Sequence, residues 1–370
     1  MLFIKLQIKI IIMQFLYLFL FIWSKFTSKE KVENIKSVGI LFLPVLGIGD
    51  LVMLSPVILK IKQAFPSAKI DLITWMPDFL DFNGVDVVSY KKVKEEKCKY
   101  DLVISPTLNL RHIPFIFLSK YWIGYFTKNK LQSNFKARGY KYDLQNKHYL
   151  TRGVKLIKSL NKEMGVKLEE EIKEKQVEYA DVNLQKPDCF DSKLSNVKYL
   201  VVSVFSKSED RQWSVEKIIR LIKEILKKGY TDKIVLIGDG SANNLSAAKN
   251  LIKLLNFSSG EIVDLTGKTT LSESSYIIKN CTLFIGLDSG PSHLAYMLAP
   301  KSLVIFVTVD PKLRLPLLKN GNKIICPYPS PPPKKPLYNG LVPVSLKNTK
   351  KCLKNITFEK VFEDLNKLMS

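Results

Sequence analysis

The sequence predicts an α/β protein in which two Rossmann-like halves face a cleft, preceded by an apolar N-terminal helix. Apolar strand-like runs alternate with amphipathic helical patterns, the order typical of parallel sheets covered by helices. The alternation occurs twice, and a charged, weakly patterned stretch at about 160–196 separates the two occurrences. We therefore divide the chain into a hydrophobic segment and linker at 1–35, a first half at 36–190, a second half at 191–353 and a closing helix at 354–370.

The first half opens with a continuous apolar run, as a buried parallel strand should. Gly47 and Gly49 then make a tight loop, and apolar residues at helical spacing follow it. Basic stretches around 90–99 and 120–152 are expected to be helical or irregular. The patterns predict strands at 38–43, 68–75 and 100–105, and a helix at 51–65.

The second half repeats the alternation. Ser214 is a plausible N-cap, with Glu216 in the first turn of the helix that follows. Seven of the 18 prolines fall at 327–343, which predicts a long extended loop. We expect strands at 198–205, 233–237, 261–265, 282–286 and 303–307, and helices at 214–228, 271–280, 294–298 and 356–369.

The N-terminal run at 10–23 contains Gln14 as its one polar residue, and lysines flank it on both sides. Fourteen residues are too few to span a bilayer comfortably, and extension back to Leu2 includes two lysines. No small-residue cleavage site follows Trp23. Residues 2–23 are therefore expected to contact a membrane, as a marginal signal anchor or as a helix in its surface, with the following domain cytoplasmic. The alternative is an apolar helix packed on the protein itself.

The net charge of +23 predicts attraction to nucleic acid, anionic lipid or a phosphorylated substrate. Three zones, at 1–38, 116–152 and 311–351, carry most of it, which favours anionic lipid and an acidic glycan over general basicity. A compositional bias spread over the surface is the competing interpretation. Five cysteines do not make a disulfide scaffold, and whether Cys326 pairs with Cys352 stays open. No spacing of histidines and cysteines predicts a metal site.

Two strand-to-helix turns carry candidate chemistry. In the first, Gly47 and Gly49 let a ligand approach the backbone, and Asp50 is either a helix-capping acid or a general base. The third glycine of a dinucleotide fingerprint is missing. In the second, the sequence DSGPSH at 288–293 places a helix N-terminus after an apolar strand, a ready site for a diphosphate. An ordinary turn in which Asp288 caps the helix is the alternative.

A third candidate is the polar loop SKSEDRQW at 206–213. Arg211 can clamp a phosphate there, although one arginine in a loop is more often solvated. Together the three motifs resemble glycosyltransferase family 9, the bacterial lipopolysaccharide heptosyltransferases. The resemblance rests on ILFLPVLGIGDLVMLSPVILKIKQAFPSAKIDLITW, on KSEDRQW, on LTGKTTLSESSYIIKNCTLFIGLDSGPSHLAYMLA and on the closing CLKNITFEKVFEDLNKLM, and covers about 36–369.

The resemblance implies a GT-B fold in which the first half binds the acceptor and the second half binds a nucleotide sugar. It implies inverting, metal-independent transfer, commonly from ADP-heptose, with no cofactor. Asp50 matches the family's proposed catalytic base. The implied donor-binding residues are Ser206, Lys207, Arg211, Asp288, Ser289, Gly290, Ser292 and His293, with Gly47 and Gly49 in a phosphate-proximal loop. The expected acceptor is an anionic lipid-linked glycan at the cytoplasmic face of the inner membrane.

Two departures from the family pattern bear on the donor. Lys207 stands where the family often has Thr or Ser, and the stretch SANN at 241–244 lacks the acid that helps hold the ribose. The nucleotide therefore stays open. The alternatives are a non-catalytic sugar-nucleotide-binding protein, and another Rossmann-type enzyme such as a sugar-nucleotide epimerase or an oxidoreductase. Nucleic-acid binding, which the charge alone suggests, is not expected.

Overall fold

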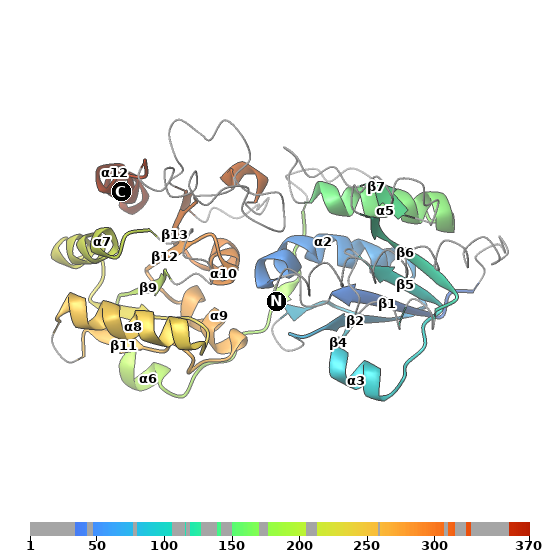
Figure 1. Cartoon of the computed structure of the whole chain (residues 1–370), viewed down its shortest axis with the longest axis horizontal. Coiled ribbons are helices and arrows are strands. Elements are labelled where there is room, and N and C mark those ends of the chain that lie inside the picture. The colour runs from blue at the N-terminus through green and yellow to red at the C-terminus, as the bar shows by residue number, and fades with distance from the viewer. Residues whose placement is uncertain are drawn as a thin grey trace, which may run out of the picture.

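The computed structural model of the chain contains two parallel sheets, each covered by helices on both faces (Figure 1). The structure describes residues 34–42, 47–76, 80–105, 115, 119–126, 139–141, 150–169, 177–204, 213–257, 260–306, 310–314, 323–326 and 355–370. The predicted α/β class with parallel sheets is confirmed. The expected N-terminal helix lies outside the described residues. None of the helices in the described ranges has the length and apolar character needed to cross a membrane.

The N-terminal sheet has the strand order β4-β2-β1-β5-β6-β7 and is parallel throughout. Side chains of successive residues point to opposite faces, and the central strands β1 and β5 are buried on both faces, so these two strands are mostly apolar. Helices α2 and α5 cover one face and α3 the other. The strands are β1 (Ser37–Phe42), β2 (Lys69–Thr74), β4 (Asp86–Ser89), β5 (Leu102–Ser105), β6 (Tyr121–Phe126) and β7 (Gly139–Lys141), and the helices are α2 (Ile48–Ala64), α3 (Tyr90–Glu95) and α5 (Thr151–Met164).

The C-terminal sheet has the strand order β11-β10-β9-β12-β13-β14 and is also parallel. Helices α7, α8 and α12 pack on one face, and α9 and α10 on the other. The strands are β9 (Tyr199–Ser203), β10 (Lys233–Leu236), β11 (Ile262–Asp264), β12 (Leu283–Leu287), β13 (Lys301–Ile305) and β14 (Lys323–Ile325). The helices are α7 (Val215–Lys227), α8 (Ala242–Leu255), α9 (Leu271–Lys279), α10 (Gly290–Leu298) and α12 (Phe358–Met369).

Between the sheets runs a short connection that contains β8 (Asp181–Val182) and α6 (Phe190–Lys193). Strand β8 pairs in antiparallel fashion with β3 (Leu80–Asp81), so the connection is tied back to the N-terminal half. One continuous cluster of buried apolar side chains includes residues of both sheets, among them Ile40 of β1 and Val201 of β9. The two halves therefore share part of their core.

Each sheet reverses its strand order at one point, between β1 and β5 in the first and between β9 and β12 in the second. Ligands of open α/β sheets bind at such points, beyond the carboxyl ends of the strands. The helix that follows β1 is α2, and the helix that follows β12 is α10. These two helices contact each other between the sheets (Figure 1). The fold therefore brings two ligand-binding positions together.

Candidate functional site

The N-terminus of α2 is built as a capping box around Asp50. The backbone N–H of Gly47 donates to Asp50 Oδ2 at 2.9 Å. One carboxylate oxygen of Asp50 therefore caps the helix, as the first of the two interpretations of this residue predicted. The second oxygen, Oδ1, is turned elsewhere: it lies 3.5 Å from a guanidinium nitrogen of Arg314. Asp50 thus caps its own helix with one oxygen and faces the other half of the molecule with the second.

The N-terminus of α10 begins at Gly290, four residues earlier than the sequence pattern predicted. Ser289 is the N-cap residue, so Asp288 does not cap this helix, and Pro291 lies in the first turn, where its missing N–H costs nothing. The Ser292 hydroxyl is fully buried and donates to the Leu287 carbonyl at 2.5 Å. This hydroxyl therefore fastens the turn to the end of β12.

His293 lies one turn into α10 and is 5% exposed. Its Nε2 is 3.7 Å from Asp288 Oδ1, and its ring packs edge-on against Tyr296. Burial raises the pKa of Tyr296 well above its usual value, and burial also raises the pKa of the Cys326 thiol, to about 12. Both groups are therefore neutral at physiological pH, and Cys326 is a free thiol. Cys352 lies outside the described residues.

The two helix N-termini meet through their glycines. A Cβ on Gly49 would lie 2.2 Å from the Cδ2 atom of His293, and a Cβ on Gly290 would lie 3.1 Å from the side chain of Ile48. Each glycine therefore makes room for a side chain of the opposite helix. We expected Gly49 to allow close approach by a ligand, whereas in the structure the side chain that approaches Gly49 is that of His293.

Two buried polar atoms at this contact have no hydrogen-bond partner among the described residues: the hydroxyl of Ser289 and Nδ1 of His293. Buried polar atoms are nearly always satisfied, so each unsatisfied one calls for an explanation. Both lie at a helix N-terminus, where backbone dipoles favour negative charge. A bound anion at this position would give both atoms a partner.

The other predicted donor residues, Ser206, Lys207 and Arg211, lie outside the described residues. Strand β9, which precedes them, is the neighbour of β12, and Ser203 pairs with Gly286. The loop ends at Trp213, which is buried and donates from its indole N–H to the Ile356 carbonyl at 3.0 Å. The described residues contain no cluster of three or more His, Cys, Asp or Glu side chains arranged to hold a metal ion.

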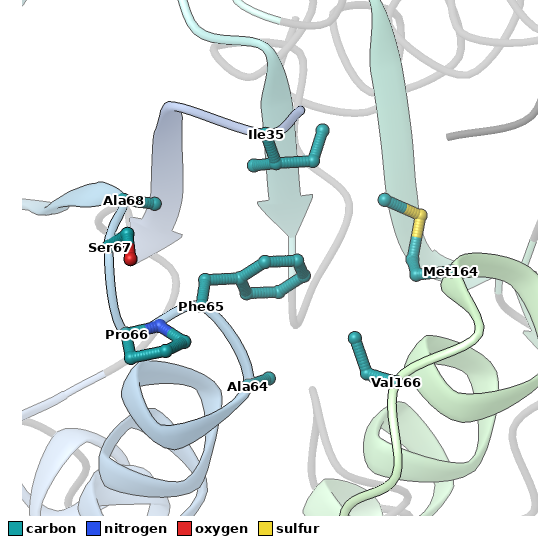
Figure 2. Close-up of a pocket in the computed structure, with 8 residues that line it drawn as sticks. All are labelled: Ile35, Ala64, Phe65, Pro66, Ser67, Ala68, Met164 and Val166. Carbon is teal, nitrogen blue, oxygen red and sulfur yellow. The ribbon is translucent and has the colours of Figure 1, made fainter. Parts of the chain in front are cut away.

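A cavity of about 280 Å³ lies at the opposite end of α2 (Figure 2). Seven of the eight residues that line it are apolar and the eighth is Ser67, and Figure 2 shows the ring of Phe65 pointing between Ile35 and Met164. Helix α2 has 17 residues and is about 25 Å long at 1.5 Å per residue. The cavity is therefore far from Asp50 and takes no part in the candidate site.

The sequence profile of glycosyltransferase family 9 (heptosyltransferase) matches residues 91–336, well over half of the chain. The chain belongs to glycosyltransferase family 9. Lipopolysaccharide heptosyltransferase 3 of Escherichia coli K12 is 22% identical over 295 residues, which cover 71% of this chain and 80% of that protein. Lipopolysaccharide heptosyltransferase 1 of Campylobacter coli is 33% identical over 130 residues, a match that spans only 37% of its length.

Solved structures of family 9 members share the fold. The Escherichia coli ADP-heptose heptosyltransferase II superposes with a TM-score of 0.65 at 16% identity, covering 90% of this chain and 98% of that chain. A family 9 glycosyltransferase from Veillonella parvula gives 0.62 at 17% identity, covering 92% and 99%. An Escherichia coli heptosyltransferase solved with ADP-2-deoxy-2-fluoro heptose gives 0.56 at 17% identity, covering 90% and 99%.

One residue of the candidate site, Arg314, was not found from the sequence. Arg314 follows a short 3-10 turn, η5 (Pro311–Leu313), beyond the end of β13. No local motif singles it out, and it was counted only as part of the basic zone at 311–351. Its contact with Asp50 depends on the packing of the two halves, which no spacing within the sequence reveals.

Proposed function

We propose that this family 9 protein transfers a heptose-type sugar from a nucleoside-diphosphate donor to a lipopolysaccharide-core or related surface-glycan acceptor. Transfer inverts the anomeric centre and needs no metal ion. The observation that carries the proposal is the contact between the N-terminus of α2, which contains Asp50, and the N-terminus of α10, where Ser289 and His293 hold unsatisfied buried atoms. An acid and an anion-binding helix end thus face each other from opposite halves.

The chemistry follows from this arrangement. Asp50 takes the proton of the acceptor hydroxyl, the acceptor oxygen bonds to the anomeric carbon from the face opposite the diphosphate, and the bond to the diphosphate oxygen breaks. The departing electron pair stays on the diphosphate. The N-terminus of α10 and Arg211 are the groups we assign to that charge, because helix dipoles and guanidinium groups stabilise phosphate oxygens.

The heptosyltransferase II structure is named for ADP-heptose, and another of the similar structures was solved with ADP-2-deoxy-2-fluoro heptose, which supports an adenine nucleotide as the first donor to test. The stretch at 241–244 lacks the acid that family members use to hold the ribose, but the loop after β10 contains another acid next to it. Asp239 stands just before that stretch, and its Oδ1 accepts from the Asn244 side chain at 2.7 Å and from the Ser241 N–H at 3.1 Å. The exposed carboxylate of Asp239, which Asn244 holds in place, is therefore a candidate partner for a ribose at this edge.

Among the described residues of the N-terminal half, the aromatic ring classed as exposed is that of Trp75. Trp75 directly follows β2, whose last residue Thr74 pairs with Phe42 of β1, and it is 48% exposed. The carboxyl ends of β1 and β2 are neighbours, so Trp75 lies on the edge of the sheet from which the Asp50 loop departs. An indole face is a suitable surface for a sugar ring, because its apolar area is large and rigid. This supports acceptor binding by the N-terminal half.

A thermal-shift panel of nucleotide sugars, followed by a transfer assay with the stabilising donor, tests the proposal. A ligand that binds the native state raises Tm by mass action. We expect ADP-heptose or another nucleoside-diphosphate sugar to stabilise the protein, and a glycan product to form. Donor binding without product on any core acceptor would favour a non-catalytic binding protein. Conversion of the donor to an epimer without an acceptor would favour the epimerase alternative.

The membrane-surface location is part of the same proposal. Residues 10–23 are apolar apart from Gln14, lysines lie on both sides of them, and a lipid-linked acceptor would be presented at the inner face of the membrane. Vesicles of mixed zwitterionic and anionic lipid should sediment the full-length protein. A variant that lacks residues 1–33 should stay in the supernatant, and equal sedimentation of both would contradict the assignment.

A further inference from the structure

The ion pair between Asp50 and Arg314 joins the two halves of the molecule at the proposed base. Asp50 belongs to α2 of the first half, and Arg314 follows η5 of the second. Their side chains are 22% and 19% exposed. A pair this well shielded from solvent is screened less by salt than a surface pair. The contact therefore places a guanidinium group of the second half beside the Asp50 carboxylate.

The capping box leaves only one oxygen of Asp50 for chemistry. Oδ2 accepts from the Gly47 N–H, whereas Oδ1 faces Arg314. In the ligand-free arrangement, the oxygen that would accept the proton is thus the oxygen that Arg314 restrains. His293 and Asp288 are the other titratable groups on the facing helix turn.

The pair is loosely made. Its N–O distance of 3.5 Å exceeds the roughly 2.7–2.9 Å of a charge-assisted hydrogen bond. A diphosphate offers several anionic oxygens, which suit the two-pronged geometry of a guanidinium better than one carboxylate oxygen does. Arg314 also lies beyond the carboxyl end of β13, the neighbour of β12, whose turn leads into α10. A donor diphosphate at the N-terminus of α10 would lie at the same edge of the sheet.

We propose that Arg314 is shared between Asp50 and the donor diphosphate, so that donor binding releases the base. The inference rests on the proposed function. Before the donor arrives, Arg314 pairs with Asp50 Oδ1. When the diphosphate binds, the guanidinium moves to the phosphate oxygens, and Oδ1 becomes free to take the acceptor proton. In the transfer step Arg314 then neutralises the charge that the breaking bond leaves on the diphosphate.

A double-mutant cycle on nucleotide affinity tests this sharing. ADP and UDP binding is measured by calorimetry for the wild type, Asp50→Asn, Arg314→Ala and the double variant. Asp50→Asn keeps an oxygen for the Gly47 N–H but removes the competing charge, so it should tighten ADP or UDP binding by about 3- to 10-fold. Arg314→Ala should weaken binding. In the Arg314→Ala background, Asp50→Asn should have no further effect, because the competition has disappeared.

The transfer rate supplies the second readout. Arg314→Ala should lower kcat and raise the donor KM, and Arg314→Lys should restore part of both, because a lysine retains the charge but not the fork. Arg220 is the matched control: it pairs with Glu359 on the surface between α7 and α12 at 3.2 Å, and Arg220→Ala should change neither quantity.

Several outcomes would overturn the inference. Unchanged affinity in Asp50→Asn contradicts it, and so does a tightening that survives in the double variant, which would reflect simple repulsion between Asp50 and the diphosphate. Equal loss of transfer in Arg314→Lys and Arg314→Ala with normal nucleotide affinity in both would also contradict it. Absence of ADP and UDP binding to a folded wild-type protein would instead contradict the proposed function, and the sharing with it.

Discussion

His293 occupies the space that a side chain on Gly49 would fill: a Cβ there would lie 2.2 Å from Cδ2 and 2.6 Å from Nε2 of the imidazole. Gly49→Ala should therefore push α2 and α10 apart or force His293 out of its buried position. Overpacking of this kind costs about 1–3 kcal/mol. Thermal or urea unfolding measures the loss, and transfer should fall with it.

Gly47→Ala is the matched control for stability. Its Cβ would find no atom nearer than 4.0 Å, and its φ of −88° is open to alanine. If Gly47→Ala and Gly49→Ala lower the unfolding free energy equally, the contact with His293 does not explain why position 49 is a glycine.

Asp50→Asn should abolish transfer while the protein remains folded and able to bind nucleotide. The asparagine oxygen can still accept from the Gly47 N–H, so the start of α2 is preserved. It cannot take a proton from an acceptor hydroxyl at neutral pH. Loss of a general base typically costs a factor of about 10² to 10⁴ in rate. Near-normal turnover in this variant, measured with the donor that stabilises the wild type, would remove Asp50 from the role of base.

Trp213→Phe tests the anchor at the end of the loop that contains Arg211. The substitution removes the indole N–H that bonds the Ile356 carbonyl and leaves a small void. We expect a loss of about 1–3 kcal/mol in unfolding free energy. The Lys217 ammonium also donates to Ile356, at 2.9 Å, so the carbonyl keeps one partner. Unfolding in urea measures the loss, and a donor KM that rises as well would connect this anchor to donor binding.

Asp101 should make stability depend on pH in the acid range. The ion pair with Lys120 at 2.8 Å, together with bonds from the backbone N–H groups of Lys36 and Ser37, lowers the pKa of Asp101 to about 2. Because the folded pKa lies below the unfolded value near 3.9, the stabilisation is present above about pH 4 and is lost as the pH falls toward 2.

Asp101→Asn should thus reduce the unfolding free energy by about 2 kcal/mol at pH 7, and by progressively less below pH 4. Urea titrations across that range check the sign. Asp86→Asn serves as the control, because Asp86 is exposed and its oxygen is 4.0 Å from Lys69. A difference between Asp101→Asn and wild type that grows toward low pH would contradict the assignment.

The central strands of both sheets could be predicted because they are buried on both faces and are therefore continuously apolar. Strands β1, β9 and β12 lie within one or two residues of their predicted bounds. The edge strands β4, β7 and β14 were not predicted, since they have three or four residues and lack such runs. Helix α8 was also missed: Asn243, Asn244 and Ser246 weaken its helical pattern, although Ser241 caps it.

The candidate site was predictable in its parts but not in its assembly. The turns at Asp50 and at 288–293 stood out because glycine, proline and acidic residues cluster there after apolar strands. Gly49 accommodates His293, and Arg314 reaches Asp50. Both contacts depend on how the two halves of the chain pack against each other. Such contacts leave no periodic signal in either segment, so sequence patterns alone could not find them.

The reciprocal contact of Gly49 with His293 and of Gly290 with Ile48 also limits how this enzyme can be recombined. A chimaera can take its acceptor half from one family member and its donor half from another. The N-termini of α2 and α10 would then come from different proteins and would not be complementary in shape. Residues 48–49 and 290–293 should therefore be exchanged as one matched unit. A chimaera that exchanges only one side should misfit at this crossing even when each half folds well.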